Sequence, residues 1–261
     1  MSATIDKMAS VHPDAQIGEG SVIGPFCVVG PNVKIGKNAK LQSNIVVDGH
    51  TTIGDNARIF PFASVGTQSQ DLKWKEGNVS YTEIGDNVII RENVTIHAGT
   101  DHGTKTTIGN DCSLLALSHV GHNCEVGNDV VLSHSATLGG HTIVGDHANI
   151  GGLSAVHQFV HIGQGAMVAG MARVIQDILP FTIAEGAPAA SRIVNKIGME
   201  RTGFTKEEVS AARTAYKTIF MKKLPLEEAV EILKKDFSDN RAIDTILDFL
   251  GKAERGLARP N

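Results

Sequence analysis

The residues best suited to chemistry are histidines in three short segments in the middle of the chain. The segments are SHVGHNCEVG (118–127), GGHTIVG (139–145) and AVHQFV (155–160). Residues 18 apart in them form two columns, His122 with Gly140 and Gln158, and Asn123 with His141 and Phe159. If each turn of the fold takes 18 residues, residues 18 apart lie next to each other on neighbouring turns. An imidazole and a bare glycine amide then share one narrow strip of the surface. Such a strip can supply a general base, an oxyanion donor and a substrate clamp.

A simpler interpretation is that these residues are solvated turns. For one histidine at an exposed turn, solvation is the better interpretation, because polar residues are common at surface turns. Four hydrogen-bonding side chains and a glycine stacked in one strip are harder to explain in that way. The stacked set therefore favours a catalytic site.

The element that must position these residues is a repeat of six. An aliphatic residue occupies every sixth position over residues 5–65, 84–96 and 108–174, and all 26 of these positions are Ile, Val or Leu. This period suits neither an α-helix nor a meander. It predicts a parallel β-helix of triangular section, in which three hexads close one coil of 18 residues. Residues 18 apart then lie about 4.8 Å from each other, the spacing of strands in a sheet.

Glycine and small residues take fixed places in this repeat. Glycine often follows the aliphatic residue, as at Gly18 and Gly24, and we expect it at the corner because a positive or otherwise unusual backbone angle is cheap only without a side chain. The fourth residue after the aliphatic one is small and points inward. Cys27, Cys112 and Cys124 occupy this inward slot. We therefore expect buried structural thiols rather than nucleophiles or zinc ligands.

Two segments interrupt the repeat, and the C-terminal part of the chain has a different pattern. Residues 67–82 shift the phase and residues 99–107 lose the aliphatic residue, so we expect both to project as loops. Beyond residue 186 the apolar spacing is helical, with capping-box spacing at Thr205 and Glu208. We predict a mainly β protein, with a β-helix over residues 1–186 and an α-helical domain over residues 187–261.

Composition and charge exclude several classes of protein. The 261 residues carry 24 Lys and Arg against 28 Asp and Glu, which does not suit a nucleic-acid binder. No apolar run is long enough to cross a membrane, and the first residues lack the features of a secretory signal. Three cysteines do not make a disulfide framework in a chain of this size. We expect a cytoplasmic protein with reduced thiols, without membrane insertion.

Six motifs carry a resemblance to one family of transferases. They are QDLK (70–73), IRENVTIH (90–97), HVGHN (119–123), GGH (139–141), AVHQF (155–159) and ERTGF (200–204). With the hexads and the helical tail, the chain resembles the UDP-N-acetylglucosamine 3-O-acyltransferases of lipid A biosynthesis over nearly its whole length. The resemblance implies a left-handed β-helix. It also implies transfer of a 3-hydroxyacyl chain from acyl carrier protein to the 3-hydroxyl of UDP-N-acetylglucosamine.

The resemblance assigns roles to individual residues. His122 would be the general base that takes the proton of the sugar hydroxyl, and Asn123 would fix its tautomer. The backbone amide of Gly140 would hold the oxyanion, and His141 would lie beside it. The residues that match contacts to the sugar nucleotide are Gln70, Asp71, Lys73, His119, His157, Gln158, Asn195 and Arg201.

The resemblance implies partners rather than a cofactor or a metal. The donor would bring its acyl chain on the phosphopantetheine of acyl carrier protein. That acidic protein would be attracted to residues 192–261, which hold 14 Lys and Arg against 11 Asp and Glu. Members of the family are homotrimers whose sites form between subunits. Met167 and Gly170 match the end of the acyl groove, where a glycine implies room for a longer chain.

Three positions depart from the pattern of the family. The residue after the base is usually Asp and is Asn123 here, which supplies no negative charge to an imidazolium. Thr202 replaces the second basic residue of the ERTGF turn. Ile197 stands where an acidic residue is common.

Three other functions stay open on the sequence alone. The sibling N-acyltransferase of the same pathway also places Asn after its histidine, but it carries a globular domain before the β-helix, whereas the hexads here begin at Ile5. A zinc enzyme resembling γ-carbonic anhydrase would use pairs such as His97 with His102, or His119 with His122. A scaffold without activity would catalyse no transfer.

Overall fold

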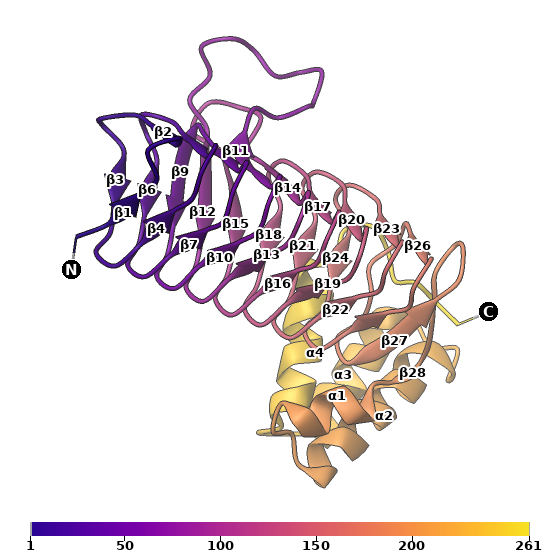
Figure 1. Cartoon of the computed structure of the whole chain (residues 1–261). Helices are drawn as coiled ribbons and strands as arrows, with labels where there is room; N and C mark the ends of the chain where they lie inside the picture. Colours follow the sequence, from indigo (N-terminus) through magenta and orange to yellow (C-terminus); the bar gives the residue numbers. More distant parts are fainter. Residues whose placement is uncertain (1, 261) are drawn as a thin grey trace.

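The computed structural model describes residues 2–260 and has two parts, a long β-helix and a helical segment at its C-terminal end (Figure 1). Successive coils add short strands to three sheets, called faces 1, 2 and 3 below. Partner residues are 18 apart wherever a coil is regular, as for Ile5 and Ile23. The predicted fold, a left-handed parallel β-helix followed by helices, is confirmed.

As far as residue 174 the strands of each face follow the chain at intervals of three, and face 1 then ends with two further strands. Face 1 contains β1 (Thr4–Ile5), β4 (Val22–Ile23), β7 (Lys40–Leu41), β10 (Arg58–Ile59), β13 (Ile89–Ile90), β16 (Ser113–Leu114), β19 (Val131–Leu132), β22 (Asn149–Ile150), β25 (Met167–Val168), β27 (Thr182–Glu185) and β28 (Ala190–Val194). Face 2 contains β2 (Ser10–Val11), β5 (Val28–Val29), β8 (Val46–Val47), β11 (Ser64–Thr67), β14 (Thr95–His97), β17 (His119–Val120), β20 (Thr137–Leu138), β23 (Ala155–Val156) and β26 (Arg173–Val174). Face 3 contains β3 (Gln16–Ile17), β6 (Lys34–Ile35), β9 (His50–Ile53), β12 (Tyr81–Ile84), β15 (Lys105–Ile108), β18 (Glu125–Val126), β21 (Ile143–Val144) and β24 (His161–Ile162).

The core of the β-helix is built from the aliphatic frame and the small residues that follow it. Ile59 and Leu114 are completely buried, and so are Cys27, Cys112 and Cys124. Burial raises the pKa of Cys112 to about 11 and that of Cys124 to about 12, so neither thiol ionises at neutral pH. The prediction that the cysteines point inward is confirmed.

The prediction that glycine holds the corner through a positive φ is wrong. Gly18, Gly24 and Gly54 do not have a positive φ, which falls two residues later, as at Asn56 (φ 58°). A Cβ added to Gly54 would lie 2.6 Å from the carbonyl carbon of Gly85 in the next coil. Glycine is required there because neighbouring coils approach closely, whereas Asn tolerates the left-handed region.

Two insertions project from the corner between faces 2 and 3, the longer of them at the top of Figure 1. Equivalent residues are 31 apart across the first insertion and 24 apart across the second, instead of 18. Both loops are shorter than predicted and occupy residues 68–80 and 98–104. Residues 81–82 and 105–107, predicted as loop, belong to the four-residue strands β12 and β15, which pair in register from Tyr81 with Lys105.

The C-terminal segment packs on the last coils. Its helices are α1 (Lys196–Arg201), α2 (Lys206–Phe220), α3 (Leu226–Asp236) and α4 (Arg241–Lys252). The predicted capping box opens α2, because the Thr205 side chain accepts from the Glu208 amide and Glu208 accepts from the Thr205 amide. The segment from residue 187 is not purely helical, because residues 190–194 form β28 antiparallel to β27. Phe181 of the last coil packs against Phe204 and joins the two parts.

Candidate active site

His122 lies at the corner between faces 2 and 3, two residues after β17. Its carbonyl oxygen accepts from the amide of His141 at 2.9 Å, so the two residues are on neighbouring coils. The side chain faces away from the apolar core, yet it is only 9 % exposed because the loop at 68–80 reaches over it. The corner therefore holds an imidazole that is sheltered from bulk water.

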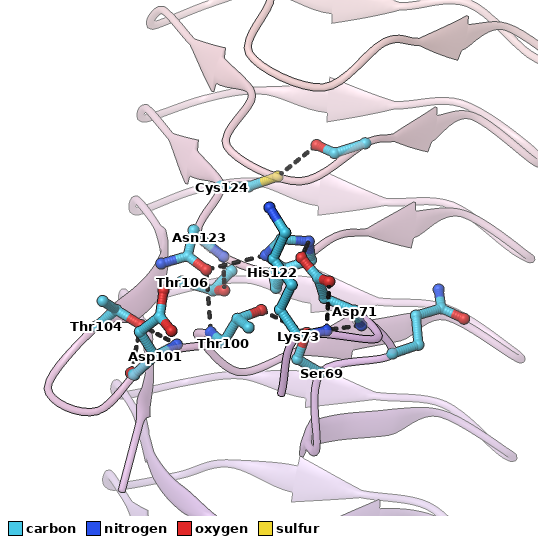
Figure 2. A network of polar contacts seen from close by, with 12 residues as sticks. Ser69, Asp71, Lys73, Thr100, Asp101, Thr104, Thr106, His122, Asn123 and Cys124 are labelled. Carbon is cyan, nitrogen blue, oxygen red and sulfur yellow. Dashed lines mark hydrogen bonds and ion pairs between the residues drawn. The ribbon is translucent and has the colours of Figure 1, made fainter. Parts of the chain in front are cut away.

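Both ring nitrogens of His122 have defined neighbours (Figure 2). Nδ1 lies 3.0 Å from Oδ1 of Asn123, and the same oxygen accepts from the amide of Thr100 at 3.0 Å. Two donors on one amide oxygen fix the proton of the neutral imidazole on Nδ1. Nε2 is then the nitrogen that can take a proton, and it lies 3.4 Å from Oδ2 of Asp71. Asp71, predicted as a sugar contact, thus stands against the base itself.

Gly140 packs against the imidazole from the next coil. A Cβ added to Gly140 would collide with Nε2 and Cε1 of His122 and would lie 2.9 Å from Cδ2. Within residues 2–260 the amide of Gly140 donates no hydrogen bond. A free backbone donor therefore lies beside the nitrogen that can act as a base, as an oxyanion site requires.

His141 stands on the other side of His122. The two rings are nearly perpendicular, with centroids 5.2 Å apart, and His141 stacks on Phe159 at 4.6 Å. Burial, followed by repulsion from His122, lowers the pKa of His141. His141 is therefore a neutral neighbour near pH 7.

Two further histidines, His97 at the end of β14 and His119 in β17, lie close to His122. His119 contacts Oγ1 of Thr95 through Nδ1 at 2.7 Å and Nε2 of Gln70 through its own Nε2 at 3.4 Å. Burial, with repulsion from His97 and His122, lowers the pKa of His119 to about 4. His97 lies 5.0 Å from the His119 ring, and its Nδ1 is buried with no hydrogen-bond partner in residues 2–260. His97 was not predicted as a neighbour of this site, because the second insertion makes equivalent residues 24 apart and the 18-residue spacing does not bring His97 to His119.

The other predicted contacts lie around this centre. Lys73 is exposed on the loop at 68–80, and its amide donates to Asp71. His157 and Gln158 are exposed on the coil after that of Gly140, and Nδ1 of His157 bonds the carbonyl oxygen of Gln158. These side chains follow the same corner of the β-helix as His122.

Asn195 and Arg201 belong to α1 rather than to the corner. The Asn195 side chain accepts from the amide of Gly198 and donates to the carbonyl oxygen of Gly165 at 3.1 Å. It is therefore the N-cap of α1 and joins this helix to the β-helix. Arg201 is exposed in the last turn of α1.

Met167 and Gly170 lie at a different corner, between faces 1 and 2. Met167 is 38 % exposed in β25, and the neighbouring Met171 is 75 % exposed. Within one chain the structure therefore separates these two residues from His122.

The described residues contain neither a metal-binding cluster nor a membrane span. No group of three or more His, Cys, Asp and Glu in residues 2–260 is placed to hold a metal ion. Across the same residues no helix is long and apolar enough to cross a bilayer.

Family models match three parts of the chain. One described as UDP N-acetylglucosamine O-acyltransferase, domain 2, matches residues 177–258. One for the bacterial transferase hexapeptide matches residues 105–140, and one for the GMPPB C-terminal domain matches residues 5–100. These matches cover the helical segment and most of the β-helix.

Whole-chain relatives agree with these matches. The acyl-[acyl-carrier-protein]–UDP-N-acetylglucosamine O-acyltransferase of Akkermansia muciniphila is 51 % identical over 97 % of this chain and 98 % of its own length. That of Thermodesulfovibrio yellowstonii is 42 % identical over 98 % and 99 %. The crystal structure of the UDP-N-acetylglucosamine acyltransferase of Francisella novicida superposes with a TM-score of 0.94 at 36 % identity, over 98 % of this chain and 94 % of its own.

A hexapeptide β-helix with a sheltered histidine beside a free glycine amide defines an acyltransferase of the hexapeptide-repeat class. Within that class, the chain belongs to the family of acyl-[acyl-carrier-protein]–UDP-N-acetylglucosamine O-acyltransferases. The predicted resemblance is confirmed, and the sibling N-acyltransferase and the zinc enzyme are not supported.

Proposed function

We propose that this protein transfers a 3-hydroxyacyl chain from acyl carrier protein to the 3-hydroxyl of UDP-N-acetylglucosamine, the first step of lipid A biosynthesis. The observation that carries the proposal is the contact between the His122 ring and Gly140, which pairs a base with a free backbone donor. The printed names of the relatives, which pair the same carrier and sugar nucleotide, support it.

In the proposed reaction Nε2 of His122 removes the proton of the sugar hydroxyl, and the oxygen attacks the thioester carbonyl carbon. The hydroxyl would take the place that the Asp71 carboxylate now holds at Nε2. The Gly140 amide would donate to the oxyanion. Collapse would break the carbon–sulfur bond, and the departing thiolate would take the proton from His122. Asp71 would stay near enough to stabilise the transient imidazolium.

The remaining contacts follow the corner of His122. We propose that the sugar nucleotide is bound along the corner by Gln70 and Lys73 of the loop at 68–80 and by His119, His157 and Gln158 of the coils around the base. Arg201 would reach the nucleotide phosphates from α1. Asn195 would contribute mainly by holding α1 in place, since its side chain already caps that helix.

We also propose a homotrimer with sites between subunits, because one chain separates the base from the predicted acyl groove. The corner between faces 1 and 2 carries a stripe of exposed apolar side chains, Phe26, Phe62, Leu117, Leu153 and Met171, each more than half exposed. Such a stripe needs a covering partner. A neighbouring chain would bring its own base to this stripe, and the acyl chain would lie along it toward Gly170. The enzyme would act in the cytoplasm with no cofactor beyond the donor's phosphopantetheine.

The test is mass spectrometry of the products from UDP-N-acetylglucosamine and a panel of acyl carrier protein thioesters. Replacing His122 by Ala should lower turnover by on the order of 10²-fold or more, because the general base is lost. His147→Ala is the matched control, since His147 lies at the corner between faces 3 and 1 and pairs with Asp129. Unchanged turnover in His122→Ala, or no acylated product from the unaltered protein, would exclude the proposal.

A further inference from the structure

The two projecting loops meet at backbone contacts such as that between Gly103 and Val79, and at a pair of buried hydroxyl groups. Oγ of Ser69, in the loop at 68–80, lies 2.7 Å from Oγ1 of Thr100, in the loop at 98–104. Both side chains are 2 % exposed, although the loops that carry them project from the β-helix. A buried hydroxyl pair at the junction of two exposed loops holds them in a fixed relation.

One end of this pair leads to Nδ1 of His122 (Figure 2). The amide of Thr100 donates to Oδ1 of Asn123 at 3.0 Å, and that oxygen accepts from Nδ1 of His122 at 3.0 Å. The Asn123 amide donates in turn to Oγ1 of Thr106 at 2.8 Å, which fixes the backbone of Asn123. Any shift of the Thr100 backbone therefore moves a donor that orients the Asn123 carboxamide.

The other end leads to Nε2 of the same histidine. Oγ of Ser69 accepts from the amide of Asp71 at 3.1 Å, and Oδ2 of Asp71 lies 3.4 Å from Nε2 of His122. The contacts close a ring through His122, Asn123, Thr100, Ser69 and Asp71. The residue at each ring nitrogen is thus held by a different loop, Asn123 by the amide of Thr100 and Asp71 by the hydroxyl of Ser69.

We propose that Ser69 and Thr100 are positioning residues for acyl transfer, whose hydroxyl pair helps to couple the two loops and thereby holds the His122 ring in its orientation with Asp71 close beside it. The proposal rests on the function proposed above. Neither hydroxyl touches the reacting atoms, and each acts through its neighbours. Without the pair, the link of the loop at 68–80 to Thr100 is reduced to the bond from Nδ2 of Asn78 to the carbonyl oxygen of Thr100. The Ser69 hydroxyl that accepts from the Asp71 amide is then no longer held.

A purely structural role makes a different prediction. If the pair only stabilised the loops, its loss would lower the melting temperature and leave the turnover of the folded enzyme unchanged. If the pair positions the base, kcat falls at temperatures where the protein is folded, because small displacements of catalytic groups reduce rates strongly. The tautomer of His122, observed by ¹⁵N NMR of histidine-labelled protein, would also become mixed.

The experiment compares Thr100→Val and Ser69→Ala with Thr100→Ser, which keeps the hydroxyl. Thr104→Val is the matched control in the same loop, because the Thr104 hydroxyl bonds only the backbone of Asp101. We expect Thr100→Val and Ser69→Ala to lower kcat on the order of 10-fold. Thr100→Ser and Thr104→Val should stay within about 2-fold of the parent, since each preserves the hydroxyl pair.

The double variant Ser69→Ala/Thr100→Val separates a shared role from two independent ones. Because the two hydroxyls act through one bond, the double variant should be no slower than the slower single variant. Additive losses, or unchanged kcat in both single variants with His122→Ala inactive, would overturn the inference and leave the proposed function intact. Turnover preserved in His122→Ala would instead remove the proposed function on which the inference rests.

Discussion

At the residue scale, two neighbours of His122 divide one task. An Asp directly after the base, which the resemblance to the family predicts at this position, would both fix the tautomer and offset the imidazolium charge. Here Asn123 fixes the tautomer through Nδ1, and Asp71 supplies the negative charge at Nε2. The departure at position 123 therefore does not leave the base without a counter-charge.

The low pKa of His119 makes the stability of the fold depend on pH. Because the folded pKa is about 4 against an ordinary value of 6.5, the unfolded chain binds a proton between these values that the folded chain does not. The contribution of His119 to the free energy of unfolding is fully present above pH 6.5 and is lost as the pH falls toward 4. Replacing His119 by Asn should make the fall of the melting temperature from pH 7 to pH 4.5 shallower, as measured by differential scanning calorimetry.

The exposed His134 supplies the control for this measurement. His134→Asn should reproduce the pH slope of the parent protein, since its ring is not taken out of water. Parallel slopes for the His119→Asn variant and the parent would contradict the argument.

At the element scale, the hexad corner depends on two backbone requirements that lie two residues apart. At the corner between faces 3 and 1 the first position is a glycine because the next coil touches it, as at Gly54, and at every corner the third position must tolerate a positive φ. Asn and Asp meet the second requirement on most coils, but Phe26, Leu117 and Leu153 also adopt it at the corner between faces 1 and 2. Bulky apolar residues in this strained conformation accord with a face that a partner covers.

Glycine-to-alanine substitutions should therefore have opposite effects at different sites. Gly54→Ala should lower the free energy of unfolding by about 1–3 kcal/mol, because its Cβ would meet the backbone of Gly85. Gly251→Ala in α4 should raise it by about 0.5 kcal/mol, because nothing lies within 4 Å of its Cβ and a helix loses less entropy with alanine. Urea unfolding of both variants measures the difference, and effects of the same sign would contradict it.

At the scale of the whole molecule, two corners of one chain carry the two halves of the proposed site. The corner between faces 2 and 3 bears the base, and the corner between faces 1 and 2 bears the apolar stripe and Gly170. An exposed apolar edge and a polar catalytic edge on the same prism suit a closed ring in which each edge meets the other.

Enlarging Gly170 tests the apolar half of the proposed site. A Cβ at Gly170 would lie 3.2 Å from the carbonyl oxygen of Gly152, so a methionine fits with a small local shift and extends into the groove. Gly170→Met should move the preferred donor toward shorter acyl chains in competition assays with mixed thioesters. His147→Met, at the corner between faces 3 and 1, should leave the profile of chain lengths as it is. An unaltered profile in Gly170→Met would dismiss the groove assignment.

The sequence by itself determined the coil and its contents. A strict period of six can bury its aliphatic residues only by closing a triangular coil, so the register that stacks His122 under Gly140 was available from spacing alone. The inward cysteines, the capping box at Thr205 and the place of His122 at a corner followed from the same local rules.

Only the tertiary structure decided what the irregular segments do. Loops of 31-residue and 24-residue coils have no period, so nothing in their sequence placed Asp71 at Nε2 of His122 or joined Ser69 to Thr100. The strand β28 and the cap at Asn195 likewise depend on packing against the last coils. The conformation of a periodic segment follows from the spacing of its residues, whereas the conformation of an insertion depends on its tertiary contacts.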